Sequence, residues 1–310
     1  MMIVVSILHV LAALTLAPLL LGLINRTKAI MAGRQGPPLV QLYFDLYKLL
    51  RKGAVYSRTT SWLFRAGPVV SLAAVAAALL IVPLGGVSGL LAFPGDLILF
   101  AYLLGLMRFV TVLAALDTGS AFEGMGASRE VTFSALAEPA LLISLACLAR
   151  QTASLSLSGI YAGLDLGLIA APGGVAALLA GAAIFIVLLT ENARIPIDDP
   201  NTHLELTMIH EAMVLDHGGP DLAFIEYGAA LKLWVLSALL VGVLAPIRGP
   251  VAVSAIVSLV AMGLLAIVIG VVESVMARLR LIRVPQLLSA AMVLAVLALA
   301  VAAFAGSPGR

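Results

Sequence analysis

Long apolar segments that are almost free of charge dominate this 310-residue chain. A helix that crosses the hydrocarbon core of a membrane needs about 20 such residues. Hydrophobic residues make up 62% of the chain and charged residues 11%, against about a quarter charged in soluble domains. We therefore predict an all-α polytopic membrane protein, a single integral membrane domain over 1–310. Its eight transmembrane helices are expected at 2–24, 66–83, 96–116, 132–149, 173–190, 226–246, 251–272 and 285–305.

Three segments need separate interpretation. Glu138 and Pro139 interrupt the fourth predicted span. The first span has no Lys or Arg before Arg26 and is longer than the core of a cleaved signal peptide, so we expect it to be retained. Residues 151–172 are rich in Gly, Ser and Leu and are expected to form an interfacial loop rather than a ninth span.

Positive charge alternates between the predicted loops. The loops at about 25–65, 117–131, 191–225 and 273–284 carry most of the Lys and Arg, whereas the loops between them hold only Arg150 and Arg248. Cytoplasmic loops of membrane proteins are enriched in Lys and Arg. The odd-numbered loops are therefore expected to be cytoplasmic, with both termini on the outer face.

The first predicted loop contains an amphipathic segment, LVQLYFDLYKLLRK, at 39–52. Its Leu and Tyr residues at 39, 42, 43, 46, 49 and 50 share one helical face, and its charged residues occupy the other. This pattern is typical of a helix lying in the membrane interface. Two roles stay open, a surface anchor or a brace beside a cavity. The turn-forming run before it is expected to present Arg34 to a partner protein.

Residues 191–227 hold eight of the sixteen carboxylates and three of the four histidines. Pro196 and Pro200 exclude a regular helix from 194 to 201. The run Thr202-His203-Leu204-Glu205 has the form of a capping box and predicts a new helix, which the Gly-Gly-Pro at 218–220 ends. Irregular backbone near membrane depth is tolerated only when it is buried in protein or lines a wet cavity. This segment therefore predicts a cytoplasmic funnel or docking surface.

The chain offers no evident metal or redox site. His203 and His210 stand about 10 Å apart along a helix, too far to share one zinc ion. Histidines that contact a partner or relay protons are the favoured interpretation. One cysteine, Cys147, cannot form an internal disulfide or hold an iron–sulfur cluster. We expect no catalytic residue and no cofactor in this chain.

Ionisable side chains also stand inside or at the ends of the predicted spans, where they are costly and by default functional. A row of carboxylates with one lysine, running from the 191–227 segment into the bilayer, suits proton transfer. The alternative is structural, with Arg108 paired to Glu138 or Asp117 to hold helices together. Glu273 is expected to reach the arginines of the last cytoplasmic loop. The candidates for an ion path are Glu138, Glu191, Glu226, Lys232 and Arg108.

Two sequence motifs resemble a known family. Residues 191–198, ENARIPID, resemble the E-x-x-R-x-P-x-D signature of the quinone-site membrane subunit of respiratory complex I, and Glu226-Tyr227 matches its later Glu-Tyr pair. The Asn-Arg at 25–26 and the Gly-Pro-Pro at 36–38 depart from that subunit. The segments DDPNTHLELTMIHEAMVLDHGG and GMGASREVTFSALAEPALL resemble instead the corresponding subunit of group 4 membrane-bound NiFe hydrogenases, of the formate hydrogenlyase, hydrogenase-4 and energy-converting types.

The resemblance implies a membrane-anchor and ion-coupling subunit, itself non-catalytic, of a hydrogenase-type oxidoreductase complex in a prokaryotic cytoplasmic (inner) membrane. Such a subunit docks a hydrophilic redox arm and contributes to proton or sodium translocation. The expected partners are hydrogenase-like large and small subunits, a ferredoxin-like iron–sulfur subunit, an antiporter-like membrane subunit and the lipid bilayer, with no nucleic acid. The NiFe centre and the iron–sulfur clusters are expected in those partner subunits.

The resemblance also implies site residues. Glu138 falls where the complex I family has an intramembrane Glu of its proton path. The glycines of 124–130 are expected to let a loop approach the arm closely, with Arg129 and Glu130 paired across that contact. The residues expected at the interface with the hydrophilic arm are Arg34, Arg129, Glu130, Arg194, Asp198, Asp199, His203, Glu205, His210 and Glu211.

Three alternatives remain open at this point. The first is the quinone-site membrane subunit of a complex I-like NADH or ferredoxin:quinone oxidoreductase. The second is a stand-alone secondary transporter, although the chain lacks the paired broken helices in two matching halves that transporters often show. The third is an anchor with no role in ion movement.

Overall fold

The computed structural model describes residues 2–164, 172–198, 208–247 and 249–305. Within these ranges, eight helices are long and apolar enough to cross a membrane. An apolar chain in lipid must satisfy its backbone polar groups internally, which the helix does. The prediction of eight spans is confirmed. They are α1 (Met2–Met31), α3 (Trp62–Ile81), α4 (Asp96–Asp117), α5 (Ala121–Thr152), α8 (Pro172–Glu191), α10 (Pro220–Leu244), α11 (Val251–Val275) and α12 (Val284–Ala305).

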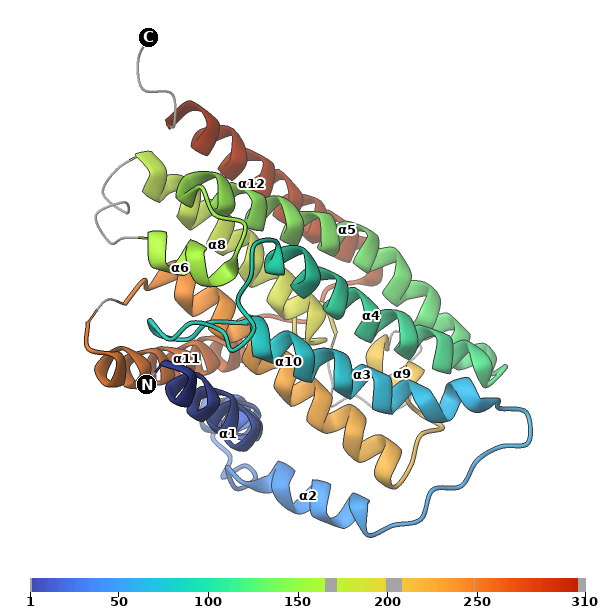
Figure 1. Cartoon of the computed structure of the whole chain (residues 1–310). Helices are drawn as coiled ribbons and strands as arrows, with labels where there is room; N and C mark the ends of the chain where they lie inside the picture. The colour runs from blue at the N-terminus through green and yellow to red at the C-terminus, as the bar shows by residue number, and fades with distance from the viewer. Residues whose placement is uncertain (1, 165–171, 199–207, 248, 306–310) are drawn as a thin grey trace.

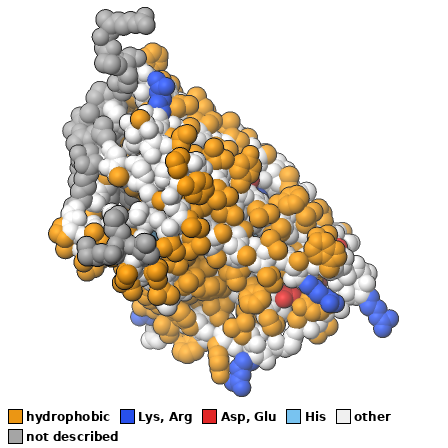
Figure 2. Space-filling model, viewed as in Figure 1, with side chains coloured by type: hydrophobic (Ala, Val, Ile, Leu, Met, Phe, Trp, Pro, Cys, Tyr) orange, Lys and Arg blue, Asp and Glu red, His pale blue; other side chains and the backbone are white. Residues whose placement is uncertain are grey.

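Helix α10 forms the centre of the bundle and packs against α1, α3, α8 and α11. About 72% of its apolar window is buried, against 28% for α11 and for α12. In Figure 1, α3, α4, α5, α8, α10 and α12 run along a common diagonal, and α1 and α11 pack together at one side of this set. Hydrophobic side chains cover most of the face in Figure 2, as expected of a surface that faces lipid.

Small residues let neighbouring helices approach closely. Helices α8 and α12 pack along most of their length, and alanines stand on the buried side of each, spaced three or four residues apart. Membrane helices are held together largely by such close backbone approach, because lipid tails are as apolar as the side chains. The fully buried alanines are Ala176, Ala180 and Ala183 on α8, and Ala291, Ala295 and Ala298 on α12.

Helix α5 differs most from the prediction. It begins at Ala121 and continues through Glu138 and Pro139 to Thr152, so most of the segment expected as a loop at 117–131 is helical, and its cytoplasmic position stays a prediction. Proline is tolerated inside a membrane helix when neighbouring groups satisfy the freed backbone. The glycines at 124 and 126 therefore stand on a helix that extends beyond the predicted span.

A ten-residue helix, α2 (Gln41–Leu50), occupies the predicted amphipathic segment. Leu42 is buried, and the hydroxyl of Tyr43 donates to the carbonyl of Thr15 on α1. Leu50, expected on the packed face, is 53% exposed, and Phe44 is 60% exposed. The apolar residues are thus divided between a packed side and an outer side, and a position in the membrane interface stays a prediction. Figure 1 shows α2 outside the main bundle, next to α1 and α10.

Short elements complete the described chain. In the region expected to be an interfacial loop, α6 (Leu157–Gly163) is a helix of two turns. The capping box at 202–205 lies outside the described residues. Of the described residues that follow it, only α9 (His210–Met213) is helical before α10 starts at Pro220, so the predicted helix does not continue unbroken to the glycines. A 3-10 turn, η1 (Leu281–Arg283), leads into α12.

Candidate functional site

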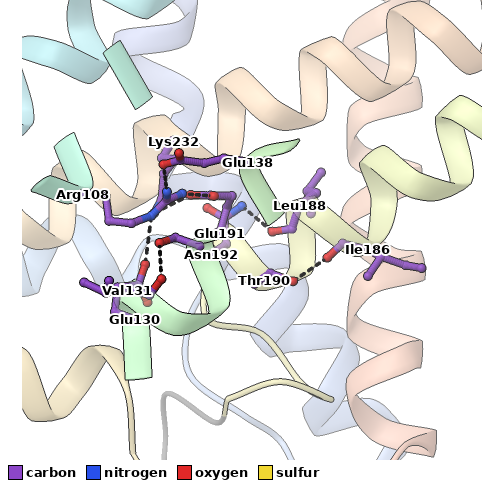
Figure 3. A network of polar contacts seen from close by, with 11 residues as sticks. Arg108, Glu130, Val131, Glu138, Ile186, Leu188, Thr190, Glu191, Asn192 and Lys232 are labelled. Carbon is purple, nitrogen blue, oxygen red and sulfur yellow. Dashed lines mark hydrogen bonds and ion pairs between the residues drawn. The ribbon is translucent and has the colours of Figure 1, made fainter. Parts of the chain in front are cut away.

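An ion cluster centred on Arg108 joins four helices inside the bundle (Figure 3). The Arg108 guanidinium, on α4, pairs with Glu138 of α5 and with Glu191 at the end of α8. Its Nε lies 3.1 Å from Oε1 of Glu130, also on α5. The ammonium of Lys232, on α10, lies 3.8 Å from Oε2 of Glu191. Two cations and three carboxylates therefore meet between α4, α5, α8 and α10.

The charge balance of the Arg108 cluster suits proton exchange. With all five groups ionised, the cluster carries one uncompensated negative charge. An uncompensated charge is expensive in a low-dielectric site, and a carboxylate relieves that cost by taking up a proton. Arg108 and Glu191 are more than nine-tenths buried, whereas the Glu138 side chain is 48% exposed. The arrangement can hold one exchangeable proton, and Glu138 is its most accessible carboxylate.

A cavity of about 330 Å³ opens beside Glu138 between α4 and α5. Arg108, Glu138 and Glu191 lie at its polar end, and Tyr102 of α4, 73% exposed, lies at its outer edge. A charged group that faces hydrocarbon is costly and usually faces protein or water instead. The cavity therefore leads from the ion cluster to an outer face of the bundle, where contact of lipid with the Glu138 carboxylate would be unfavourable.

The turn after α8 is fixed by a second set of ion pairs. Arg194 reaches Oε1 of Glu273 at 3.5 Å, and Lys28 of α1 reaches the other oxygen of Glu273 at 2.7 Å. Asp198 pairs with Arg278 at 2.7 Å. These contacts tie the 192–198 turn to the ends of α1 and α11 and to the segment that follows α11. The turn is consequently held in one position, and its residues from Arg194 to Asp198 are buried.

Residues 208–213 pack on the 192–198 turn and on α5. One oxygen of Asp198 accepts hydrogen bonds from the backbone amides of Ile209 and His210, at 3.1 and 3.2 Å. Arg129 donates to the carbonyl of Met208 at 2.9 Å. A Cβ atom on Gly126 would lie 2.9 Å from the Ile209 carbonyl oxygen, so this approach depends on glycine.

A polar cavity of about 180 Å³ lies between this segment, α1 and α10. Glu211 and Glu226 face it. Burial, with smaller contributions from the nearby charges of Glu226 and Asp198, raises the pKa of Glu211 to about 7. Burial, with a smaller contribution from Lys232, lowers the pKa of His210 to about 4. The cavity thus places a carboxyl that titrates near neutral pH beside a neutral imidazole. Its polar lining residues are Asn25, Asn192, Arg194, Asp198, His210, Glu211 and Glu226.

The structure brings together four of the five ion-path candidates, Arg108, Glu138, Glu191 and Lys232. Glu226 lies apart from them, in the polar cavity. Of the two partners considered for Arg108 in the structural alternative, Glu138 is paired with it, whereas the Asp117 carboxylate accepts instead from the backbone amide of Ser61.

Several expected interface residues have other surroundings. Glu130 was expected to pair across the contact with the arm, but its carboxylate belongs to the Arg108 cluster inside the bundle. Glu273 does not reach the last loop, because it pairs with Lys28 and Arg194. Arg34 lies at the end of α1, in a separate pocket. Asp199, His203 and Glu205 lie outside the described residues.

Sequence reasoning missed three charged residues in these networks. Glu130 was assigned to a loop, although its spacing of eight residues from Glu138 puts both on one helical face. Lys28 was counted only as loop charge. Glu123, 1% exposed, accepts from the amide of Asp216 at 3.1 Å and so fixes the end of the 208–217 segment. A prediction of one continuous helix over 121–152 would have placed Glu123 and Glu130 on that helix.

Comparisons with known proteins agree with this architecture. The family described as NADH dehydrogenase matches residues 3–304. In Escherichia coli (strain K12), hydrogenase-4 component C is 36% identical over 234 residues, which are 75% of this chain and 72% of that protein. Formate hydrogenlyase subunit 4 of the same organism is 29% identical over 294 residues, 93% of this chain and 94% of that protein.

The fold also matches a solved structure. A chain in the membrane-bound sulfane sulfur reductase, an archaeal respiratory membrane complex, superposes with a TM-score of 0.83 at 21% identity. The match covers 97% of this chain and 99% of that chain. At this level of identity the likeness concerns the fold.

Proposed function

The chain belongs to the NADH dehydrogenase family, and from this premise we propose that it is the membrane-anchor and ion-coupling subunit of a hydrogenase-type complex. In this role it docks a hydrophilic redox arm and contributes to proton or sodium translocation. The observation that carries the proposal is the Arg108 cluster, in which three carboxylates and two cations meet inside the bundle.

The ion path proceeds in two stages. Ions enter through the polar cavity beside Glu211 and Glu226. They then reach the Arg108 cluster by way of Lys232 and Glu191, and leave toward Glu138. A connection between the two polar regions is supported by a small cavity that is lined both by Arg108 and Glu191 and by Asp198.

The docking surface for the arm consists of the 192–198 turn and the 208–213 segment. Their fixed geometry supports this role, because a preorganised surface loses less entropy on binding. Arg129, His210 and Glu211 contribute partly exposed side chains to it, and the buried Arg194 and Asp198 hold its backbone in place. We extend the proposal to Asp199, His203 and Glu205, which lie between these two segments in the sequence.

The face between α4 and α5 is where a neighbouring membrane subunit docks. Glu138 is half-exposed there within a span, beside the cavity of about 330 Å³. Ionisable residues at membrane depth face protein or water. An antiporter-like membrane subunit that covers this face would continue the ion path from Glu138.

The remaining assignments follow from the same proposal. The odd-numbered loops face the cytoplasm of a prokaryote and both termini face outward, in the inner membrane. The soluble partners are hydrogenase-like large and small subunits and a ferredoxin-like iron–sulfur subunit. These partners carry the NiFe centre and the iron–sulfur clusters.

The test is affinity purification of the tagged chain in mild detergent, with metal analysis and an H₂-evolution assay of what co-purifies. We expect nickel, iron and H₂ production. An iron–sulfur complex without nickel that reduces quinone would replace the proposal with the complex I-like alternative. A chain that purifies alone, without metal, and transports a solute would support a secondary transporter.

A quinone site is the second candidate for the polar cavity, and the cavity argues against it. Its volume is about 180 Å³, whereas pockets for small organic ligands usually measure about 300–1,000 Å³ and are mostly apolar. Charged and amide side chains form much of its lining. Such a cavity suits water and ions better than a quinone.

A further inference from the structure

A basic pocket of about 440 Å³ lies apart from the ion cluster, where α1 ends beside α11. Helix α1 stops at Met31, and the chain then turns back through Gly33 and Gly36, which have φ of +66° and +63°. A Cβ atom on Gly36 would collide with the side chain of Ala29, so the returning chain needs glycine there. Ser274 of α11 closes the other side. The pocket is therefore built by the local fold.

The described residues that line this pocket include two cations and no carboxylate. The ammonium of Lys28 lies 2.7 Å from Glu273 and has three donor hydrogens, so two remain for another acceptor. Arg34 has no carboxylate within 4.0 Å among the described residues, and its guanidinium offers five donor hydrogens. The hydroxyl of Ser274 donates to the carbonyl of Gly270 at 2.7 Å. The hydrogen-bond donors that remain in the pocket belong to the cationic side chains of Lys28 and Arg34. They are therefore suited to binding an anion such as a phosphate group.

An apolar stripe leads from the pocket along α11. Residues three, seven, ten and fourteen positions before Ser274 share its helical face. All four are exposed apolar side chains in a helix only 28% buried. At the mouth of the pocket, Ile30 and Met31 of α1 are 65% and 53% exposed. The stripe consists of Val271, Ile267, Leu264 and Val260, which are 36%, 38%, 58% and 57% exposed.

We propose that this pocket binds the phosphate of an anionic phospholipid, whose acyl chains lie along the exposed stripe of α11. Basic pockets between transmembrane helices on the cytoplasmic side are suited to anionic headgroups. The apolar stripe selects a lipid over free phosphate, because it offers a surface to acyl chains. This gives Arg34 a lipid partner in place of the protein contact expected from the sequence. The proposal does not depend on the redox reaction of the complex.

The experiment compares lipid retention by the purified complex. The complex is reconstituted into nanodiscs of phosphatidylcholine with a minor, sub-saturating fraction of phosphatidylglycerol, then re-extracted in detergent, and its lipids are quantified by mass spectrometry. Arg34→Gln removes a pocket charge. Arg58→Gln is the matched control, because Arg58 is an exposed arginine in the loop before α3. One Lys or Arg near a membrane surface changes anionic-lipid affinity by about fivefold.

We expect Arg34→Gln to retain phosphatidylglycerol about fivefold more weakly, and Arg58→Gln to match the wild type, with phosphatidylcholine equal in all three. Gly36→Val, which closes the pocket without changing charge, should lose phosphatidylglycerol as well. Equal retention by Arg34→Gln and Arg58→Gln would overturn the proposal.

Two other outcomes would also overturn it. Full displacement of phosphatidylglycerol by added inorganic phosphate would indicate a free-phosphate site. Release of hydrophilic subunits from Arg34→Gln, with its lipids unchanged, would return Arg34 to a protein interface. Because subunit composition and metal content are measured on the same preparation, failure of the lipid proposal is distinguishable from failure of the hydrogenase-type assignment.

Discussion

The guanidinium of Arg108 on α4 pairs with the carboxylate of Glu191 at the end of α8, and both side chains are more than nine-tenths buried. This pair joins two helices that are far apart in the sequence. Arg108 also pairs with Glu130 and Glu138, so it is the one residue that contacts all three carboxylates of the described cluster. The charge balance of the cluster therefore depends more on Arg108 than on any single glutamate.

We expect Arg108→Gln to destabilise the protein by about 3–5 kcal/mol, because it leaves three carboxylates, with Glu191 almost fully buried, opposite Lys232 alone. The measurement is thermal unfolding of the detergent-solubilised complex. Arg58→Gln, an exposed arginine, should change stability by less than about 0.5 kcal/mol. A variant at position 108 as stable as the wild type would show that the cluster does not depend on its charge balance.

Glu138→Gln should abolish ion translocation without changing the stability of the complex. It leaves two cations and two carboxylates, so the complex should assemble and unfold like the wild type. Ion translocation by proteoliposomes should fall to background, because the accessible proton-carrying group is gone. The control is Asp117→Asn at the end of α4, whose carboxylate accepts from the backbone amide of Ser61 and lies outside the ion cluster. Undiminished translocation by Glu138→Gln would remove Glu138 from the ion path.

Sequence reasoning succeeded where the physical cause is local. Apolar segments of sufficient length predicted the eight spans, and the ENARIPID motif predicted the family that the match over 3–304 confirms. It failed for Glu130, because the glycines at 124 and 126 suggested a loop while packing against 209–213 stabilises a helix there. The partners of Glu273 could not be predicted, because Lys28 and Arg194 are brought to it by the tertiary fold.

Two glycines two residues apart on α5, and so on opposite sides of the helix, provide a matched pair for testing the docking segment. A Cβ atom at 126 would lie 2.9 Å from the Ile209 carbonyl oxygen and 3.0 Å from Ala212, whereas a Cβ atom at 124 would meet nothing within 4 Å. Gly126→Ala should therefore displace residues 209–213 and destabilise the protein by about 1–3 kcal/mol. Gly124→Ala should be neutral or stabilising by up to about 1 kcal/mol, because alanine favours helix. Thermal unfolding and retention of the hydrophilic subunits measure both effects.

Glu211 should make stability decrease with rising pH. Its folded-state pKa is raised to about 7, mainly by burial, from an ordinary value of 4.5. Between these two values the folded state binds more protons than the unfolded state, so the stabilisation is complete below about pH 4.5 and is lost as pH rises through 7. In thermal unfolding, the Glu211→Gln variant should lack this decrease of stability with rising pH. Its infrared spectrum should also lack a protonated-carboxyl band that disappears near pH 7 in the wild type.

His217 should make stability decrease as the pH falls, in contrast to Glu211, which should make it decrease as the pH rises. Its imidazole is 7% exposed and stacks on the ring of Phe64, with centroids 3.9 Å apart and planes inclined by 6°. Burial lowers its pKa to about 4 from 6.5. The unfolded state therefore binds more protons between these values, so stability is lost as pH falls from 6.5 toward 4. His217→Phe keeps an aromatic ring against Phe64 and should remove the slope, measured by thermal unfolding across that range. A His217→Phe variant that retains the full acid sensitivity would assign the slope to another group.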